Sequence, residues 1–145
     1  MFPKTHIILG ALFTGVVFLF VRNINYYYLG LIFFSSFLID FDHYVTSVLK
    51  TREISLRKSL RYHDELMKTE IKEKKKGIRR RGDFHLFHTI EFLILVGLLG
   101  LLWDGFFYVF IGMIFHSLLD VFSLTQRGIL YRREYFLTNW AAKRI

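Results

Sequence analysis

The sequence predicts an all-α integral membrane protein in which four transmembrane helices form a bundle and a basic amphipathic cytoplasmic helix joins helices 2 and 3. Two observations carry this prediction. Of the 145 residues, 53% are hydrophobic, and they gather in four runs that approach the roughly 20 residues needed to cross a hydrocarbon core. The positive charge gathers instead in one segment between the second and third runs. We expect a single membrane domain over residues 1–145.

The four apolar runs are expected to form unkinked helices. The only proline, Pro3, precedes the first run, so no run contains a proline kink. The first run ends in Phe-Leu-Phe-Val without a small-residue cleavage site, so we interpret it as a retained helix rather than a signal peptide. There is no cysteine, which excludes disulfides, thiolate ligands and cysteine nucleophiles. The predicted spans cover residues 6–21, 26–41, 84–103 and 106–122.

The segment between the second and third runs is strongly basic. Residues 50–82 hold 13 Lys/Arg and 5 Asp/Glu, a net charge of +8 that equals the formal charge of the whole protein. Apolar positions recur there at helical spacings of three and four, which is typical of a helix lying on an anionic membrane surface. We expect anionic lipids, and no specific nucleic acid, as its partners. The stripe consists of Leu56, Leu60, His63, Met67 and Ile71.

The charge distribution also predicts the orientation in the cell membrane. The positive-inside rule places the basic segment in the cytoplasm, and both termini then lie there too. The turns after the first and third runs carry only Arg22 and Asp104 as charged residues, so they should face outward. Basic and aromatic residues alternate in the tail, residues 124–145, which favours an interfacial segment.

Histidines and aspartates collect at the predicted cytoplasmic ends of all four runs. His116 and Asp120 lie four residues apart, so both side chains leave the same helix face. Placing an ionisable group at the centre of a bilayer costs roughly 2.5–3.5 kcal/mol, so such residues usually mark function. Imidazole and carboxylate ligands suit zinc, with manganese and iron as alternatives. Eight candidates exceed one tetrahedral site, so we expect one or two divalent metals, with zinc favoured. The other six candidates are His6, Asp40, Asp42, His43, His85 and His88.

Three further roles stay open from the sequence. Asp42 and Glu91 are the candidate general bases, because a partly desolvated carboxylate has a raised proton affinity. Glu91 lies one helical turn after His88, so it could orient a ligand histidine, act as the base, or form a plain buried hydrogen bond. His63 could cap the site, although packing against lipid or protein explains it more simply.

Several motifs together resemble the prokaryotic membrane-bound metal-dependent hydrolases, a family that includes an inner-membrane protein under LexA control. The resemblance covers most of the chain and implies a prokaryotic origin. It implies a metal set drawn from the DxDH element, the later histidine and the HxxxD element. The middle element departs from the family's His-Arg-x-x-x-His-Ser pattern, because Asp83 stands at its first position and His85 is offset. The matching motifs are Thr5-His6 with Gly10, Asp40-Phe41-Asp42-His43, His88-Thr89, Gly112, His116-Ser117-Leu118-Leu119-Asp120, Thr125 and Gly128.

The expected function is metal-dependent hydrolysis at the cytoplasmic membrane boundary, with metal-activated water as the nucleophile. A phospholipid or other amphiphilic phosphoester is the first candidate substrate, and a carboxylic ester or amide is the second. One alternative is a non-catalytic membrane protein whose metal site holds the spans together while its basic helix binds anionic lipid or a partner. A metal-ion carrier is a weaker alternative, because the outer halves of the spans lack polar steps.

Overall fold

The structure is a computed structural model that describes residues 3–142, and within that range every regular element is helical. This confirms the all-α class. The last three residues of the predicted interfacial tail lie outside the described range. Seven α-helices and two short 3₁₀ turns occur: α1 (Pro3–Phe20), α2 (Tyr26–Leu38), α3 (Phe41–Thr51), α4 (Leu56–Lys75), η1 (Leu86–His88), α5 (Ile90–Leu99), α6 (Asp104–Arg127), η2 (Leu130–Arg132) and α7 (Leu137–Ala142).

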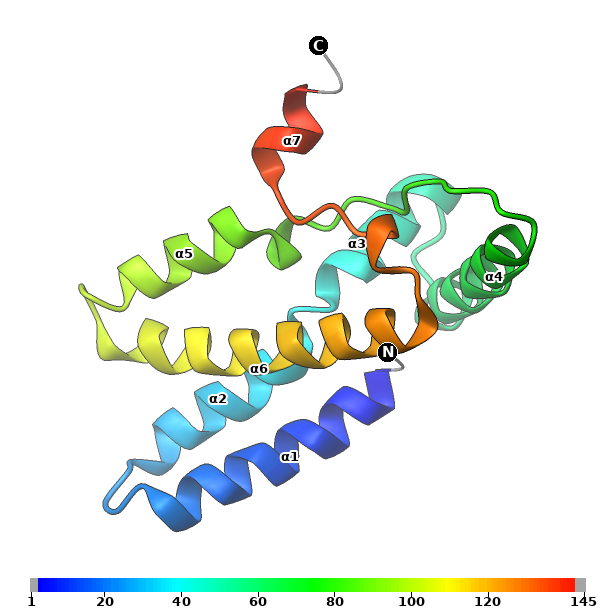
Figure 1. Ribbon diagram of the computed structural model, residues 1–145. Coiled ribbons are helices and arrows are strands. Elements are labelled where there is room, and N and C mark those ends of the chain that lie inside the picture. Colours follow the sequence, from blue (N-terminus) through cyan, green and yellow to red (C-terminus); the bar gives the residue numbers. More distant parts are fainter. Residues whose placement is uncertain (1–2, 143–145) are drawn as a thin grey trace.

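The longest helix, α6, lies at the centre of the fold. It packs against α1, α2 and α5, and the four helices extend along roughly the same direction in Figure 1. The turns after α1 and α5 lie at one end of this bundle, while α3, α4 and the segment after α6 lie at the other. The residues predicted to meet at one level therefore come from helix ends on the same side of the molecule.

Two segments are long and apolar enough to cross a membrane: residues Tyr26–Thr51, which combine α2 and α3, and residues Asp104–Arg127. The prediction of one continuous helix over residues 84–103 is wrong. Only α5 is α-helical there, and its 10 residues extend about 15 Å, roughly half of a hydrocarbon core. Thr89 is the N-cap of α5, and its Oγ1 accepts a hydrogen bond from the Phe92 amide. The α-helix therefore begins only after η1.

The predicted second span also differs from the structure. Its helix ends at Leu38, and a new helix begins at Phe41 after a turn at Ile39 and Asp40. The turn places Asp40 at the N-cap of α3, with Asp42 in the first turn of that helix. Carboxylates are favoured at a helix N-terminus, so α3 presents both side chains at a point where the chain changes direction.

Two glycines bring α1 and α6 close to α2. A Cβ at Gly112 would lie 2.0 Å from Ser35 Oγ, and a Cβ at Gly10 would lie 2.1 Å from Ser36 Oγ. Because no other residue fits this spacing, both helices can approach the backbone of α2 closely. His6 and His116 then stack face to face across the α1–α6 contact, with ring centroids 4.0 Å apart.

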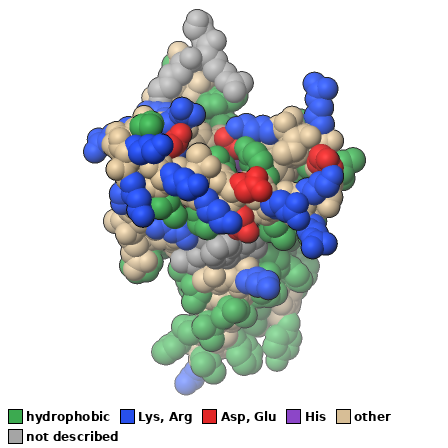
Figure 2. All heavy atoms as spheres, turned by 90° about the vertical axis from the view of Figure 1, so that its right-hand side faces the viewer, with side chains coloured by type: hydrophobic (Ala, Val, Ile, Leu, Met, Phe, Trp, Pro, Cys, Tyr) green, Lys and Arg blue, Asp and Glu red, His purple; other side chains and the backbone are tan. Residues whose placement is uncertain are grey.

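The basic segment contains the predicted helix, α4, which packs against α3. The buried Ser47 and Ser59 hydroxyls meet at 2.6 Å in this contact. Figure 2 faces the end of the molecule that carries α4, and Lys and Arg side chains spread over it while hydrophobic side chains cover the part below. Both α3 and α4 are also tied to the irregular stretch before η1, because Lys50 of α3 and Tyr62 of α4 both donate to Asp83. Burial opposes ionisation, but these two bonds outweigh it and lower the pKa of Asp83.

Candidate metal centre

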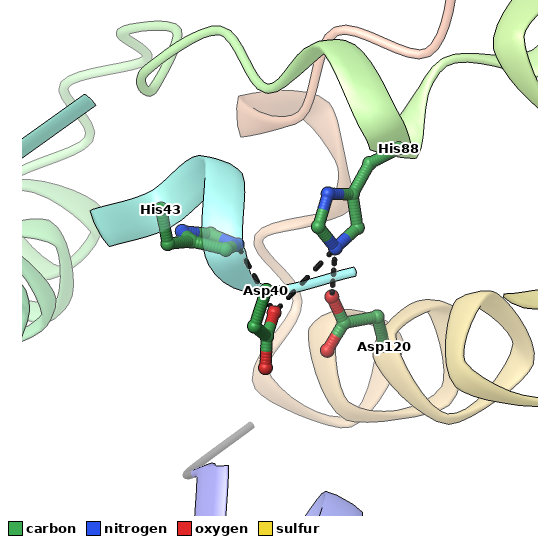
Figure 3. Close-up of side chains that lie close together, drawn as sticks. All are labelled: Asp40, His43, His88 and Asp120. Carbon is green, nitrogen blue, oxygen red and sulfur yellow. Dashed lines mark ion pairs between the residues drawn. The ribbon is translucent and has the colours of Figure 1, made fainter. Parts of the chain in front are cut away.

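Two imidazole nitrogens and two carboxylate oxygens converge at the end of the helix bundle where the sequence predicts the ligands to meet. The Nε2 atoms of His88 and His116 lie 3.2 Å apart. Asp40 Oδ1 lies 3.6 Å from the first and 3.4 Å from the second, and Asp120 Oδ2 lies 3.8 Å and 3.7 Å from them. Zinc ligands at about 2.0–2.2 Å in a tetrahedron are about 3.3–3.6 Å apart, so these separations are of the size that a shared metal requires. Figure 3 shows Asp40, His88 and Asp120 pointing toward one another.

The second nitrogen of each histidine faces a hydrogen-bond acceptor. His88 Nδ1 lies 3.1 Å from Asp42 Oδ2, and His116 Nδ1 lies 2.8 Å from the Ser36 carbonyl oxygen. We assign the proton to Nδ1 in both rings, because a carbonyl or a carboxylate oxygen can only accept. Both Nε2 atoms are then bare acceptors that face each other.

Four acceptor atoms that face one another repel, even though one of them, Asp120 Oδ2, accepts a hydrogen bond from the Arg133 side chain. His116 is fully buried, and His88 and Asp120 are each 3% exposed, so water cannot screen the contact. A cation held between these atoms, or an extra proton on the imidazoles, removes the repulsion. The donor set therefore fits a divalent metal bound by nitrogen and oxygen.

The remaining predicted ligands surround this group. All eight predicted side chains occur in three overlapping groups that could each hold a metal ion. Within each group, the ligand atoms lie within 4.8 Å of one another. Asp40 and His43 each belong to two of them. The groups are Asp40, His43, His88 and Asp120; His6, Asp40 and His116; and Asp42, His43 and His85.

Several buried polar atoms in these groups have no hydrogen-bond partner among the described residues. They include both ring nitrogens of His6, although its Nε2 lies 3.2 Å from Asp120 Oδ1. Asp42 Oδ1 and His85 Nδ1 also lack a hydrogen bond and lie 3.8 Å apart. Such atoms are rare in folded proteins and often mark an ion site. The offset His85 thus shares a ligand group with Asp42 and His43, although it departs from the family pattern.

Asp42 binds the Nδ1 side of the His88 ring, away from the Nε2 atom that faces His116. Its Oδ2 accepts hydrogen bonds from the Phe87 amide at 2.9 Å and from His88 Nδ1 at 3.1 Å. This arrangement fixes the ring of His88 with Nε2 directed at the shared centre, as carboxylates behind metal-bound histidines do. Asp42 therefore positions a ligand through one oxygen, while its other oxygen faces His85.

We expect Asp42→Asn to weaken metal binding by about 10–100-fold, the usual effect of losing the carboxylate behind a ligand histidine. The asparagine keeps the volume of the side chain but offers a single oxygen. Titration with a competing chelator measures the affinity. Asp64→Asn on α4 makes the same change of charge and should leave the affinity unaltered, because Asp64 lines the cavity but belongs to none of the ligand groups. Equal affinity in both variants would contradict the role of Asp42.

Arg133 belongs to the site, although the sequence placed it only in the interfacial tail. Its Nη1 donates to Asp120 Oδ2 at 2.7 Å, and its Nη2 lies 3.5 Å from His43 Nε2. The segment after α6 folds back to bring it there, since the Gly82 amide donates to the Arg132 carbonyl and the Ile90 amide to the Tyr135 carbonyl. In the sequence, the one indication of such a contact was that the predicted cluster contains more carboxylates than fixed positive charges.

Glu91 does not join the cluster. Its carboxylate accepts hydrogen bonds from the Leu137 and Thr138 amides at 3.0 and 3.2 Å and so holds the N-terminus of α7. His63 lies beside the site instead. Its Nε2 is 3.0 Å from the His43 carbonyl oxygen, and the two rings are 5.2 Å apart.

A cavity of about 690 Å³ opens beside the cluster. Asp40, His43, His85, Asp120 and Arg133 form part of its wall, and α4 forms much of the opposite side. The volume falls in the range of about 300–1,000 Å³ that is usual for small-molecule sites. A ligand in this cavity would reach the polar atoms from the side on which α4 lies.

Comparison of the chain with protein-family models, with curated proteins and with solved structures finds no match. The resemblance to the membrane-bound hydrolases therefore stays a prediction carried by the motifs alone. The case for a function rests on the geometry of the cluster and the cavity.

Proposed function

We propose that this protein is a membrane-embedded metal-dependent hydrolase that acts at the cytoplasmic membrane boundary on an amphiphilic phosphoester. The observation that carries the proposal is the convergence of four acceptor atoms beside a cavity of about 690 Å³. They come from the buried His88, His116 and Asp120 and from the partly buried Asp40. A structural metal site has no need of an adjoining cavity, whereas a catalytic site must admit a substrate.

The metal set in this proposal comprises the eight side chains of the three groups, for one or two divalent ions. Asp40 and His43 would be shared, since each belongs to two groups. A bound divalent metal supplies activated water and stabilises the negative charge that develops on the ester oxygen. Zinc is the first candidate because nitrogen and oxygen donors at these separations suit it, with manganese and iron next.

The protein residues divide the remaining tasks. Asp42 keeps His88 in the required tautomer, and the Ser36 carbonyl does the same for His116. Asp40 both belongs to the cluster and lines the cavity, and it contacts the imidazoles of His43, His88 and His116 through Oδ1. Asp42 is a base expected from the sequence, but its Oδ2 is occupied by the Phe87 amide and His88. Asp40 Oδ2 would accept the proton of the water in its place. Glu91 has no part in this scheme, because its carboxylate holds α7.

The proposed location follows from the apolar segments and the basic end of the molecule. The segments Tyr26–Thr51 and Asp104–Arg127 would cross the membrane, accompanied by α1 and by α5 with its flanking residues. The end with α4 would face the cytoplasm, as would both termini, because its basic residues attract anionic lipids and obey the positive-inside rule.

Removing the metal is expected to lower phosphoester hydrolysis by about 100-fold or more, because the water nucleophile loses its activation. The assay uses purified full-length protein in phosphatidylcholine nanodiscs, a strong chelator, and release of phosphate or head group from an amphiphilic phosphoester. Adding zinc back should restore turnover, and metal analysis should show zinc returning in parallel. Tight metal binding with no hydrolysis of any amphiphilic phosphoester, carboxylic ester or amide would favour the alternative of a structural metal site.

A further inference from the structure

The cavity beside the metal cluster has two chemically different ends. Next to the polar end with its aspartates and histidines, its wall continues along apolar side chains of α2, α3 and α4. We propose that this cavity binds a single-chain amphiphile with an anionic phosphate head group, which places the head beside the cluster and the hydrocarbon chain along α4. This inference rests on the proposed function for the fate of the head group, but the binding site stands on its own observations.

The apolar part of the wall is open to the outside. Leu38 and Phe41 are 54% and 56% exposed, and Leu56 and Leu60 across from them on α4 are 64% and 46% exposed. All four side chains line the cavity. Leucines on α4 repeat at a spacing of four, so they lie along one face of the helix, parallel to its axis. A hydrocarbon chain laid in this groove would cover apolar surface that the described part of the protein leaves exposed.

Arg127 supplies the charge that an anionic head group needs. Among the described residues, the hydrogen bond of its guanidinium goes to the sulfur of Met67 at 3.2 Å, a weak acceptor. The two other arginines of the cavity wall bind carboxylates, Arg132 at Glu73 and Arg133 at Asp120. Arg127 therefore keeps most of its donors for a ligand, and its planar fork matches phosphate oxygens.

The chemistry of the wall predicts how affinity depends on the ligand. For a ligand that binds from water, each further methylene that enters the groove should strengthen binding about fourfold until the groove is full. An alkyl phosphate should bind about tenfold tighter than the alcohol of equal chain length, because only the phosphate engages Arg127. A neutral lipid with two chains should bind more weakly than the alkyl phosphate. It cannot form the charged contact with Arg127, and the groove has no room for its second chain.

The test uses full-length protein in phosphatidylcholine nanodiscs and alkyl phosphates, octyl to dodecyl, that carry a photoreactive group at the chain end. Mass spectrometry of the labelled peptides locates the chain. We expect labelling around Leu56 and Leu60, weakened several-fold by Leu60→Asn. Ile71→Asn is the matched control, since Ile71 lies on the same helix outside the cavity wall.

A second pair of variants tests the head group. Arg127→Gln should reduce labelling by the phosphate probe about tenfold and leave labelling by the alcohol probe unchanged, whereas Arg57→Gln on α4 should alter neither. Labelling confined to the bundle surfaces of α1 and α6, or equal effects of Leu60→Asn and Ile71→Asn, would overturn the inference. Labelling in the groove without any hydrolysis would support the binding site and refute the proposed function. Hydrolysis with labelling outside the groove would support the proposed function and refute the binding site.

Discussion

Replacing His116 with alanine is expected to abolish metal binding, with a loss of affinity of about 100-fold or more. The substitution removes one of two facing Nε2 atoms, which lie 3.2 Å apart in the wild-type protein. It also removes one of the two imidazoles that contact both Asp40 and Asp120. His116 is fully buried, and alanine offers no donor atom in place of the lost ligand. Metal analysis after purification, followed by titration with a competing chelator, measures the loss.

Two further variants separate loss of the ligand from loss of the fold. His116→Gln keeps much of the side-chain volume and should retain helix content in circular dichroism while still losing metal. His63→Ala removes a histidine from the wall of the same cavity that belongs to none of the three ligand groups, so it should bind metal as the wild type does. Stoichiometric metal in His116→Ala, at wild-type affinity, would refute the metal centre.

The convergence of the predicted ligands could be anticipated from the sequence. It depends on how far along its run each residue lies, and not on how each helix is rotated about its axis. His116 and Asp120 share a face through the period of an α-helix, and charge patterning places that face at the end of its run. His6 begins the first run and Asp40 ends the second, so antiparallel neighbours bring them to the same level. The structure places all of these side chains in the ligand groups. This reasoning needs only the order of the runs and the position of each residue within its run.

The arrangement of the third run could not be predicted in the same way. Residues 84–89 precede the apolar residues of α5 without a proline or glycine to stop a helix, but they form an extended stretch and a 3₁₀ turn. The bond from the Phe87 amide to Asp42 helps to hold this stretch, and it joins residues 45 positions apart. The expected proximity of Glu91 to His88 assumed one continuous helix. His88 lies in η1 while Glu91 lies in α5, so the four-residue spacing does not apply.

The contribution of Arg133 escaped sequence reasoning for a related reason. Helical period and hydropathy describe neighbours within one element, whereas Arg133 reaches Asp120 after a reversal of the chain. That reversal begins at Gly128, which ends α6 in the left-handed conformation with φ of 62°. A glycine there is a recognisable helix stop, but it does not reveal where the following residues return.

Gly112→Ala is expected to destabilise the protein by about 1–3 kcal/mol, the usual effect of forcing extra volume into a packed contact. The new methyl carbon would lie 2.0 Å from Ser35 Oγ and 2.4 Å from the Ile32 carbonyl oxygen, and the second of these is backbone that cannot rotate away. Helices α2 and α6 must therefore separate. Denaturant unfolding in detergent micelles, followed by circular dichroism, measures the difference in stability.

Gly30→Ala provides the matched control, because Gly30 lies within α2 and a Cβ there meets nothing within 4 Å. That variant should gain about 0.5–1 kcal/mol from the lower backbone entropy of alanine. The separation caused by Gly112→Ala should also reach the metal centre, since Gly112 lies one helical turn before His116, whose Nδ1 depends on the Ser36 carbonyl at 2.8 Å. Metal affinity should thus fall in Gly112→Ala and remain unchanged in Gly30→Ala. Equal stability and equal metal affinity in the two variants would show that the close contact of α2 with α6 does not position His116.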